Sequence, residues 1–481
     1  MTSVPLLIGG EDVAAASSFA VHDPGRRYDV VAEVGAGRPS DVDDAVAAAE
    51  RGGAQWARVP TEERCRLLVK LSDELRALTD ELAPTLAREN GATLREARMD
   101  LERGLDGLRS AADVARDHLR PREVDTPEHW LRFTKKPVGV VGMIVPWNSP
   151  IVLSLCKVGP ALAAGNGIVL KPSPEAPVVL TRLLREIAAA LPAGALNVVN
   201  GDADVGEAIS GHPRVRMVSF TGSVPVGRAV LRGGAENIKR VALELGGNDA
   251  AIVLDDADVE TVVSSLSLGA FTRAGQVCFA VKRAYLARAR YDEFFEALRA
   301  RVDGLRVGHG LDPDSSFGPL INERARERVQ GLIERARAAG DVHELGRYVD
   351  DQTADNGSYL LPSIVRDVAH EAEIVAVEQF GPVLPLVAYD SVDEAVTMAN
   401  DSEFGLASSV WSTDIDRAVQ VADRLEAGVG FVNSHNVWSL SFDMPFGGVK
   451  QSGLGRERTE TGVQEYVEDH VIRVIKPAPA A

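Results

Sequence analysis

The sequence predicts an α/β fold in which parallel sheets are covered by helices on both faces. From residue 138 onward, short apolar runs alternate with segments of helical periodicity, which is the pattern of parallel strands joined by helical crossovers. The apolar runs are continuous, as expected for strands that are buried on both faces. The length of 481 residues allows about three structural units at roughly 150 residues each.

The first third of the chain is expected to be rich in helix. Residues 41–56 have apolar residues at helical spacing, with Ser40 as the expected N-cap. Residues 61–89 and 94–118 continue this pattern, and residues 130–134 are a candidate strand. One apolar stripe runs through the segment 61–89: Leu67, Leu68, Leu71, Leu75, Leu78 and Leu82.

Strands and helices then alternate to the end of the chain. The expected strands are 138–145, 167–170, 196–199, 217–220, 250–254, 281–287 and 383–388. The expected helices are 151–164, 177–190, 203–210, 224–234, 258–272, 290–303, 322–339, 391–400 and 414–426. We therefore expect two α/β domains with a boundary near Gly246 and Gly247, followed at the end by a short disordered tail, residues 476–481.

Composition and charge exclude several classes of protein. Hydrophobic residues make up 45% and charged residues 25% of the chain, as in ordinary globular proteins. The net charge of −18 repels nucleic acids and anionic membrane surfaces, so neither is an expected partner. Three cysteines do not form a disulfide framework, and neither a signal peptide nor a membrane span is recognisable. A cytoplasmic location is expected.

Three residues are candidates for catalytic chemistry. Cys278 follows Gly275 on a loop between a helix and a strand, so its thiol is either held exposed for reaction or is simply a small buried side chain. Cys65 and Cys156 lie inside apolar helical patterns and are expected to be buried. Glu244 ends a strand-like run and is either a base with a raised pKa or an ion-paired carboxylate. Asn148 follows a strong strand, as an oxyanion donor or as a turn residue.

A nucleotide site is only weakly indicated by the local patterns. Neither G-x-G-x-x-G nor G-x-x-x-x-G-K-[ST] occurs. Gly222 and Ser223 lie at a strand-turn-helix junction, where backbone N–H groups can hold a pyrophosphate. Lys171 ends another strand, and Glu378 with Phe380 could flank a sugar and a ring. The sequence has no H-E-x-x-H, no paired CxxC and no G-x-S-x-G, so zinc and serine-hydrolase chemistry have no starting point.

In their order along the chain these motifs resemble the aldehyde dehydrogenase superfamily, over residues 8–475. The motifs are Pro146-Trp147-Asn148, Lys171-Pro172-Ser173, Phe220-Thr221-Gly222-Ser223, Glu244-Leu245-Gly246-Gly247, Gly275-Gln276-Val277-Cys278, Glu378-Gln379-Phe380-Gly381-Pro382, Asn433 and the segment 445–457. The resemblance implies a Rossmann-like NAD(P)-binding domain (1–118 and 138–246), a catalytic α/β domain (247–445) and a small β flap (119–137 and 463–476). In this family the flap joins subunits, which implies a homodimer or homotetramer.

The resemblance also implies roles for individual residues. Cys278 matches the nucleophile, Glu244 the general base, Asn148 the oxyanion donor and Glu457 a second glutamate with a proton-relay role. The implied contacts to the cofactor are Ile144, Pro146, Trp147, Lys171, Ser173, Gly222, Ser223, Leu245, Glu378 and Phe380. No metal is implied. The implied reaction is oxidation of an aldehyde to its acid through a thiohemiacetal and a thioester on the cysteine, which glutamate-activated water then hydrolyses.

Two departures bear on the cofactor and the substrate. The family often has an acidic residue three positions after the strand-end lysine, but Pro174 stands there and Glu175 follows. With no basic residue nearby, NAD is expected and NADP stays possible. Arg273, at a position where small or amide residues are common, is expected to alter the rim of the substrate tunnel.

Two alternatives and one substrate expectation remain open. A CoA-acylating relative would lack the general base, whereas Glu244 is present, and a catalytically silent binding or structural relative would not keep the full set of Cys278, Glu244 and Asn148. The residues expected to line the tunnel are Leu153, Lys157, Val277, Phe279 and the segment 437–442. Among them, Trp438 and Phe442 favour an apolar or aromatic aldehyde.

Overall fold

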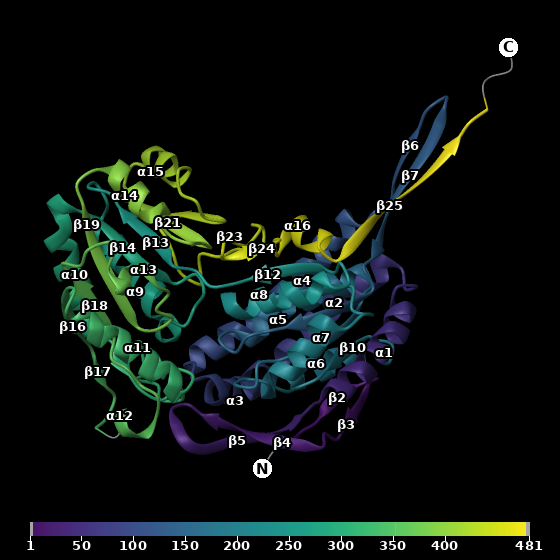
Figure 1. The fold of residues 1–481 in the computed structure, drawn as a ribbon, viewed down its shortest axis with the longest axis horizontal. Helices are drawn as coiled ribbons and strands as arrows, with labels where there is room; N and C mark the ends of the chain where they lie inside the picture. The colour runs from purple at the N-terminus through teal and green to yellow at the C-terminus, as the bar shows by residue number, and fades with distance from the viewer. Residues whose placement is uncertain (1–2, 352, 478–481) are drawn as a thin grey trace.

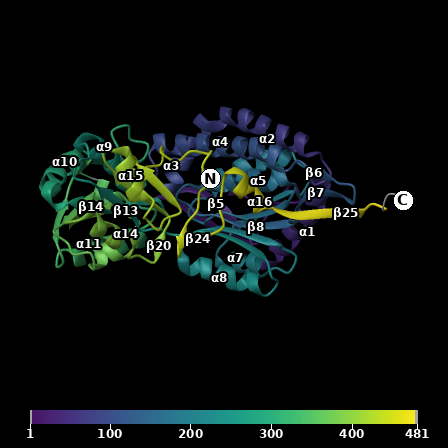
Figure 2. The same cartoon turned by 90° about the horizontal axis from the view of Figure 1, so that it is seen from above.

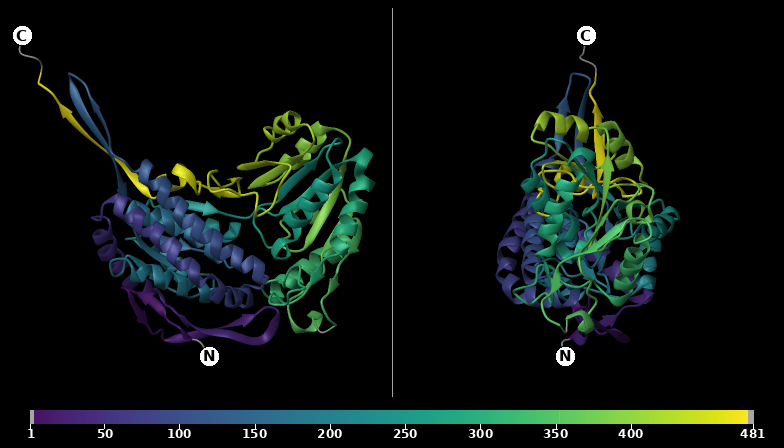
Figure 3. Two further views of the ribbon diagram at one scale, coloured as in Figure 1. Left: turned by 180° about the vertical axis from the view of Figure 1, so that it is seen from behind. Right: turned by 90° about the vertical axis from the view of Figure 1, so that its left-hand side faces the viewer.

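Two large sheets organise the fold (Figure 1), and residues 245–248 connect a strand of the first sheet to a strand of the second. The structure, a computed structural model, describes residues 3–351 and 353–477. Figure 2 shows the two helix-covered sheets side by side when the molecule is seen from above. A third sheet, of three strands, projects from the side of the first one (Figures 1 and 3).

The first sheet has eight strands in the order β24-β12-β11-β8-β9-β10-β2-β3. In that order they are Gly453–Leu454, Arg240–Glu244, Met217–Thr221, Val140–Ile144, Gly167–Lys171, Leu196–Val198, Leu6–Ile8 and Glu11–Val13. The five strands from β12 to β10 are parallel, which confirms the expected parallel sheet. The edge pairs β24–β12, β10–β2 and β2–β3 are antiparallel.

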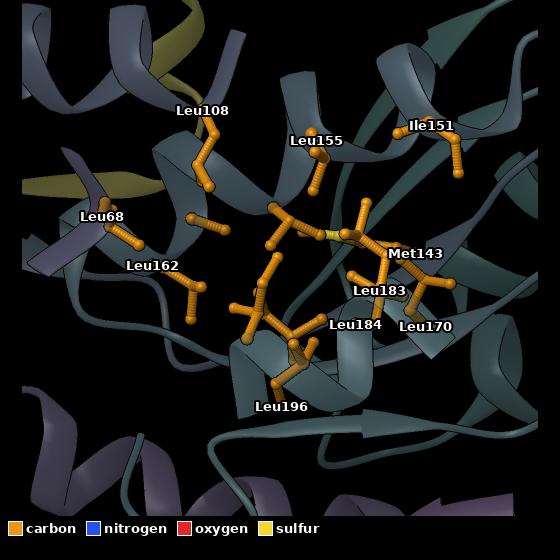
Figure 4. Packing of buried hydrophobic residues seen from close by; sticks show 14 of the residues in the cluster. Leu68, Leu108, Met143, Ile151, Leu155, Leu162, Leu170, Leu183, Leu184 and Leu196 are labelled. Atoms are coloured by element: carbon orange, nitrogen blue, oxygen red, sulfur yellow. The ribbon is translucent and has the colours of Figure 1, made fainter. Parts of the chain in front are cut away.

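Alternate side chains of these strands enter two separate cores, because successive residues of a strand point to opposite faces. Met143 and Leu170 pack into the larger core, which Figure 4 shows with Leu155, Leu183 and other leucines. The helices of that face are α2 (Thr61–Leu75), α3 (Thr79–Asn90), α4 (Leu94–His118), α5 (Pro150–Ala164) and α6 (Val178–Ala189). Val169 packs into the opposite core, formed with α1 (Pro39–Trp56), α7 (Ala203–Gly211) and α8 (Val224–Ala235).

The second sheet has seven strands in the order β16-β18-β19-β14-β13-β21-β22. In that order they are Asp341–Glu344, Ser363–Arg366, Val383–Tyr389, Val281–Ala287, Asp249–Val253, Ala407–Trp411 and Val429–Val432. One face packs against α9 (Val259–Phe271) and α10 (Tyr291–Asp303). The other face packs against α11 (Glu323–Ala336), α13 (Glu373–Ala376), α14 (Val392–Asn400) and α15 (Ile415–Ala422).

The remaining elements connect or extend these two layers. The projecting sheet has the order β25-β7-β6, from Val467–Ile475, His129–Pro137 and Arg122–Asp125. A sheet near the N-terminus is formed by β1 (Ser3–Val4), β5 (Arg26–Ala36) and β4 (Ser17–Asp23). The short elements are η1 (Arg76–Leu78), η2 (Thr272–Gly275), η3 (Arg288–Arg290), β15 (Arg306–Val307), β17 (Arg347–Tyr348), α12 (Thr353–Asn356), β20 (Phe404–Gly405), β23 (Val449–Lys450) and α16 (Thr459–Gln464).

Several expected boundaries are wrong in instructive ways. Ser40 is not the N-cap of α1: Arg38 is, in an extended conformation, because Pro39 occupies the first turn and Asp41 accepts the Arg38 N–H at 2.7 Å. The single helix expected over 61–89 is interrupted by η1. The helix expected to reach residue 426 ends at Ala422. Of the tail expected to be disordered, residues 478–481 lie outside the described residues.

Strands β18, β21 and β22 were not among the expected ones. Each has only four or five residues, but β9 and β13 are equally short and were expected, so length alone does not account for the difference. Within the described residues, no helix has both the length and the apolar character needed to cross a bilayer.

Candidate active site

A cavity of about 500 Å³ opens where the first sheet faces the second. Its walls include Trp147, Gly222 and Leu245, which lie one to three residues after the ends of strands β8, β11 and β12. Ligands of open α/β sheets bind at this carboxyl edge. Cys278 and Phe380, which precede β14 and β19, contribute the wall from the second sheet. The volume is within the range of small-molecule and cofactor sites.

A second, smaller cavity of about 60 Å³ meets the first one at three residues. Asn148, Leu153 and Cys278 line both cavities. A group bound in the larger cavity and a group bound in the smaller one would therefore both reach the Cys278 side chain. This junction is the candidate reaction centre.

Backbone geometry, close packing and hydrogen bonds fix the conformation of the Cys278 loop. Arg273 and Ala274 have left-handed backbones, with φ of 52° and 53°, and a Cβ at Gly275 would collide with the Gly381 carbonyl oxygen. The buried ammonium of Lys282 donates to the carbonyl oxygens of Val277 at 3.0 Å and Cys278 at 2.6 Å. These contacts fix a partly buried thiol at the junction of the two cavities, as the first interpretation of this cysteine requires.

The Cys278 thiol is protonated at neutral pH in this conformation. Burial raises its pKa to about 12, and the carboxylates of Asp249, Glu244 and Glu378 raise it further, while Lys282 lowers it. A nucleophilic role therefore requires a proton acceptor. Cys65 and Cys156 are buried, as expected, and burial raises the pKa of both thiols to about 11.

Asn148 lies beside the thiol on the loop after β8. Its side-chain nitrogen donates to the Gln276 carbonyl at 2.9 Å, and its backbone carbonyl accepts from the Arg273 guanidinium. An amide nitrogen has two N–H groups. The second one is available to an oxygen bound at the junction, so the geometry suits the expected oxyanion donor.

Glu244 ends β12 and is 5% exposed. Its Oε2 is buried without a hydrogen-bond partner. Burial raises its pKa well above the ordinary value, and the Glu457 carboxylate raises it further, whereas Lys157 lowers it. Glu244 lines neither cavity, yet it is near enough to raise the Cys278 pKa. Glu244 is therefore a buried carboxyl group with a raised pKa in the neighbourhood of the thiol.

Glu457 lies in the wall of the smaller cavity and forms an ion pair with the buried Lys157 of α5. Lys157, expected in the tunnel wall, therefore faces Glu457 and does not line the cavity. The two members of the pair are 300 residues apart in the sequence. Their ion pair therefore connects α5 to the distant segment before α16.

The expected cofactor contacts divide into two groups. Those that line the larger cavity are Pro146, Trp147, Gly222, Ser223, Leu245, Glu378 and Phe380. Ile144, Lys171 and Ser173 do not line it. The Lys171 ammonium donates to the Gly201 carbonyl at 2.7 Å and to the Pro172 carbonyl at 3.0 Å, and burial lowers its pKa to about 8.

The wall that would face the cofactor is partly aromatic and partly acidic. Trp147 and Phe380 meet edge to face, with ring centroids 5.9 Å apart. Glu378 accepts the Gly247 N–H at 3.2 Å and lies 3.6 Å from the Lys282 ammonium. Burial raises the Glu378 pKa, and Lys282 lowers it.

The expected tunnel wall is partly correct. Leu153, Val277, Phe279 and Val437 line the smaller cavity. Trp438 does not line it and is 44% exposed. Phe442 also lies outside its lining, so the two side chains that favoured an apolar substrate are not in this cavity. Arg273, which was expected to alter the rim of the substrate tunnel, does line the smaller cavity.

Three functional candidates were missed from the sequence. Lys282 interrupts the apolar run of strand β14. A charged residue in a strand that is expected to be buried could have marked it as a functional candidate. Arg103 of α4 and Arg458 before α16 both line the smaller cavity. Arg103 lies in an ordinary amphipathic helix pattern, so no local signal marks it. Within the described residues, no group of three or more His, Cys, Asp or Glu side chains is placed to hold a metal ion.

Comparison with known proteins identifies the family to which the chain belongs. The sequence profile of the Aldehyde dehydrogenase family matches residues 12–472. A betaine aldehyde dehydrogenase of Rhizobium etli is 36% identical over 444 residues, covering 92% of this chain and 90% of that protein. A 3-sulfolactaldehyde dehydrogenase of Pseudomonas putida is 37% identical over 467 residues, covering 94% and 92%.

Solved structures lead to the same family. A crystal structure of betaine aldehyde dehydrogenase from Staphylococcus aureus in complex with NAD+ has a TM-score of 0.93 and 32% identity, covering 98% of this chain and 95% of that one. An NAD-dependent aldehyde dehydrogenase from Sinorhizobium meliloti has a TM-score of 0.94 and 32% identity, covering 99% and 96%. The protein belongs to the aldehyde dehydrogenase family.

Proposed function

We propose that the protein oxidises an aldehyde to the carboxylic acid with NAD as the hydride acceptor. The observation that supports this most directly is the position of the Cys278 thiol, which both cavities reach. A reaction between a cofactor and a substrate needs both to meet one catalytic group, and this junction provides it.

The larger cavity suits a nicotinamide dinucleotide. Ser223 is the N-cap of α8, and the backbone N–H groups at the start of a helix favour a phosphate. Gly222 lies beside it in the wall, and its own N–H donates to the Glu244 carbonyl at 3.0 Å. Among the described residues, the buried Thr221 hydroxyl in the same wall has no hydrogen-bond partner, as expected of a group that a ligand would satisfy. When bound, the nicotinamide accepts hydride from the substrate carbon.

The protein's own residues account for the remaining chemistry. The Cys278 sulfur bonds to the aldehyde carbon after its proton passes to a base, and the Asn148 amide with the Cys278 N–H stabilises the resulting oxyanion. Loss of hydride from that carbon leaves a thioester on Cys278. Glu244, whose pKa is raised by burial, takes a proton from water, which attacks the thioester and releases the acid and the thiol.

NAD is proposed over NADP because residues 172–176 contain no basic side chain for a 2′-phosphate. Glu175, the acidic residue in this segment, accepts from the Asn322 amide at 2.8 Å, and burial raises its pKa. NADP remains the second candidate. We also propose that the subunits form homodimers or homotetramers through the sheet of β25, β7 and β6, and that the protein acts in the cytoplasm.

The test is the absorbance of reduced nicotinamide with a panel of aldehydes, each with NAD or NADP, without CoA and then with it. We expect turnover without CoA, loss of it in Cys278→Ala, and a burst of reduced cofactor followed by slow turnover in Glu244→Gln. Turnover that depends on CoA would favour the acylating alternative. Complete inactivity with every aldehyde would favour the silent one.

A further inference from the structure

Two arginines stand in the wall of the smaller cavity, the one expected to receive the aldehyde. Arg103 comes from the middle of α4 and Arg458 from the residue that precedes α16. The same cavity contains Cys278 and Asn148. A substrate whose carbonyl lies at the thiol would therefore have its remaining atoms close to these guanidinium groups.

In the part of the chain that the structure describes, neither arginine forms a contact ion pair. Within the described residues, no Asp or Glu oxygen lies within 4.0 Å of either guanidinium. Arg103 donates to the Leu440 carbonyl, and Arg458 donates to the Ser441 carbonyl at 2.7 Å. The Nε of Arg458 is buried without a hydrogen-bond partner. Each guanidinium has five N–H donors, so most of them remain free.

The carboxylates of the cavity are already engaged elsewhere. Asp100 accepts the backbone N–H groups of Ile151 at 3.3 Å and Val152 at 3.1 Å. Glu457 is paired with Lys157. The third arginine, Arg273, is committed to backbone carbonyls and lies near Asp100. Asp106 acts on Arg103, and Arg458 acts on Glu244, only at longer range, so neither guanidinium has a contacting counter-ion within the described residues.

Phe442 holds the two arginines in place. The guanidinium carbon of Arg103 lies 5.3 Å from the ring centroid, and that of Arg458 lies 4.7 Å from it. A cation over an aromatic face is stabilised without losing its N–H donors at the guanidinium edge. The Phe442 ring thus packs against both guanidinium groups. Phe442 itself does not line the cavity, whereas the two arginines do.

We propose that the substrate is a short aldehyde with an anionic group, namely a carboxylate, sulfonate or phosphate, which Arg103 and Arg458 bind. This inference rests on the proposed aldehyde oxidation. Two partly desolvated guanidinium groups without counter-ions favour an oxyanion, because such charge-assisted hydrogen bonds are short and strong. The volume of about 60 Å³ favours a short chain between the carbonyl and the anion.

The experiment compares matched aldehydes on the full-length protein with NAD. Succinic semialdehyde carries a carboxylate, and its methyl ester is the neutral control. Sulfoacetaldehyde and glyceraldehyde 3-phosphate distinguish the anion types, and betaine aldehyde provides a cation. We expect kcat/KM for at least one anionic aldehyde to exceed that of the neutral ester by about tenfold or more, the effect of a hydrogen bond to a charged group.

Variants assign the effect to the two arginines. Arg103→Met and Arg458→Met keep length and apolar character but lose the charge. Each is expected to raise KM for the preferred anionic aldehyde by about tenfold or more with little change in kcat. The methyl ester should be unaffected. Arg98→Met is the matched control, because Arg98 lies on the same helix, is exposed and pairs with Asp80.

A binding measurement that needs no turnover completes the test. Succinate should protect Cys278 from alkylation in the wild type and less so in the two variants. Equal kcat/KM for ester and acid, with no difference between the variants and Arg98→Met, would overturn the substrate inference and leave aldehyde oxidation intact. No oxidation of any aldehyde would overturn the proposed function and this inference together.

Discussion

At the scale of single residues, the surroundings of Cys278 oppose ionisation of its thiol. Burial raises its pKa to about 12, and three carboxyl groups oppose ionisation while one lysine favours it. The thiolate fraction at neutral pH is correspondingly small. Because only the thiolate reacts with alkylating reagents, reactivity must rise as the pH approaches the pKa from below.

We therefore expect the rate of Cys278 alkylation by iodoacetamide to increase about tenfold per pH unit between about pH 7 and 9, in the protein without cofactor. The measurement is mass-resolved labelling, with Cys278→Ser to account for Cys65 and Cys156. A rate that levels off below pH 8 would show that the thiol is activated without a ligand.

Among the described residues, Lys282 is the cation that lowers the pKa of Cys278. Lys282→Met removes the ammonium that holds the carbonyls of Val277 and Cys278 and faces Glu378. We expect the alkylation rate at a given pH to fall about tenfold, since loss of a neighbouring opposite charge shifts a pKa by about one unit or more.

Lys239→Met is the control for this change. Lys239 donates to the His212 carbonyl at 2.6 Å and is only partly buried, and it does not line either cavity. Unchanged alkylation in Lys282→Met, with the same Tm shift in both variants, would mean that Lys282 serves the fold alone.

At the scale of elements, helix α4 connects its own N-terminus to the reactive loop. Thr93 caps the helix by accepting the Glu96 N–H, and the Glu96 carboxylate returns to the Thr93 N–H at 2.8 Å. The other carboxylate oxygen of Glu96 accepts the Arg273 N–H at 2.9 Å. A capping box thus also anchors the left-handed backbone that precedes Cys278.

Thr93→Val should lower the free energy of unfolding by about 1 kcal/mol, the typical cost of a lost N-cap. It should also lower kcat, because Glu96 loses the hydroxyl that orients it. Thr93→Ser restores the hydroxyl and should recover both properties. Thermal unfolding and steady-state turnover check this, and a Tm of Thr93→Val equal to the wild type would contradict it.

The elements also show how much the sequence could predict. Helix α4 has the expected bounds because its amphipathic period runs over its whole length. Strand β14 also has the expected bounds, although Lys282 and Arg283 interrupt its apolar run. Cys278 and Asn148 line the same two cavities, and it was the resemblance to a family, not a local pattern, that brought them together. The pairing of Lys157 with Glu457, and the meeting of Arg103 with Arg458, join segments far apart in the chain. No local pattern encodes such contacts.

At the scale of the whole molecule, the sheet of β25, β7 and β6 stands away from the body (Figure 3). Val471 and Ile475 face one side of β25, and Ile472 and Val474 face the other, since side chains alternate along a strand. All four are exposed in the single chain. These exposed apolar side chains are the ones that the proposed homo-oligomer would cover.

We expect the double variant Ile472→Glu and Val474→Glu to reduce the molar mass in solution, because buried charges oppose association. Light scattering after size exclusion measures this. Val419→Glu is the matched control, since Val419 is a similarly exposed valine of α15. An unchanged mass in the double variant would place the subunit interface elsewhere.

The antiparallel pairing of β24 with β12 has a consequence for how the protein is made. β12 carries Glu244 at its end, but its neighbour β24 is formed by residues 453 and 454, and Glu457 and Arg458 follow. These residues leave the ribosome after Cys278, which precedes them by more than 170 positions. A nascent chain therefore carries its cysteine before the groups beside it are in place, and the reaction centre can form only after residues 453–458 have emerged.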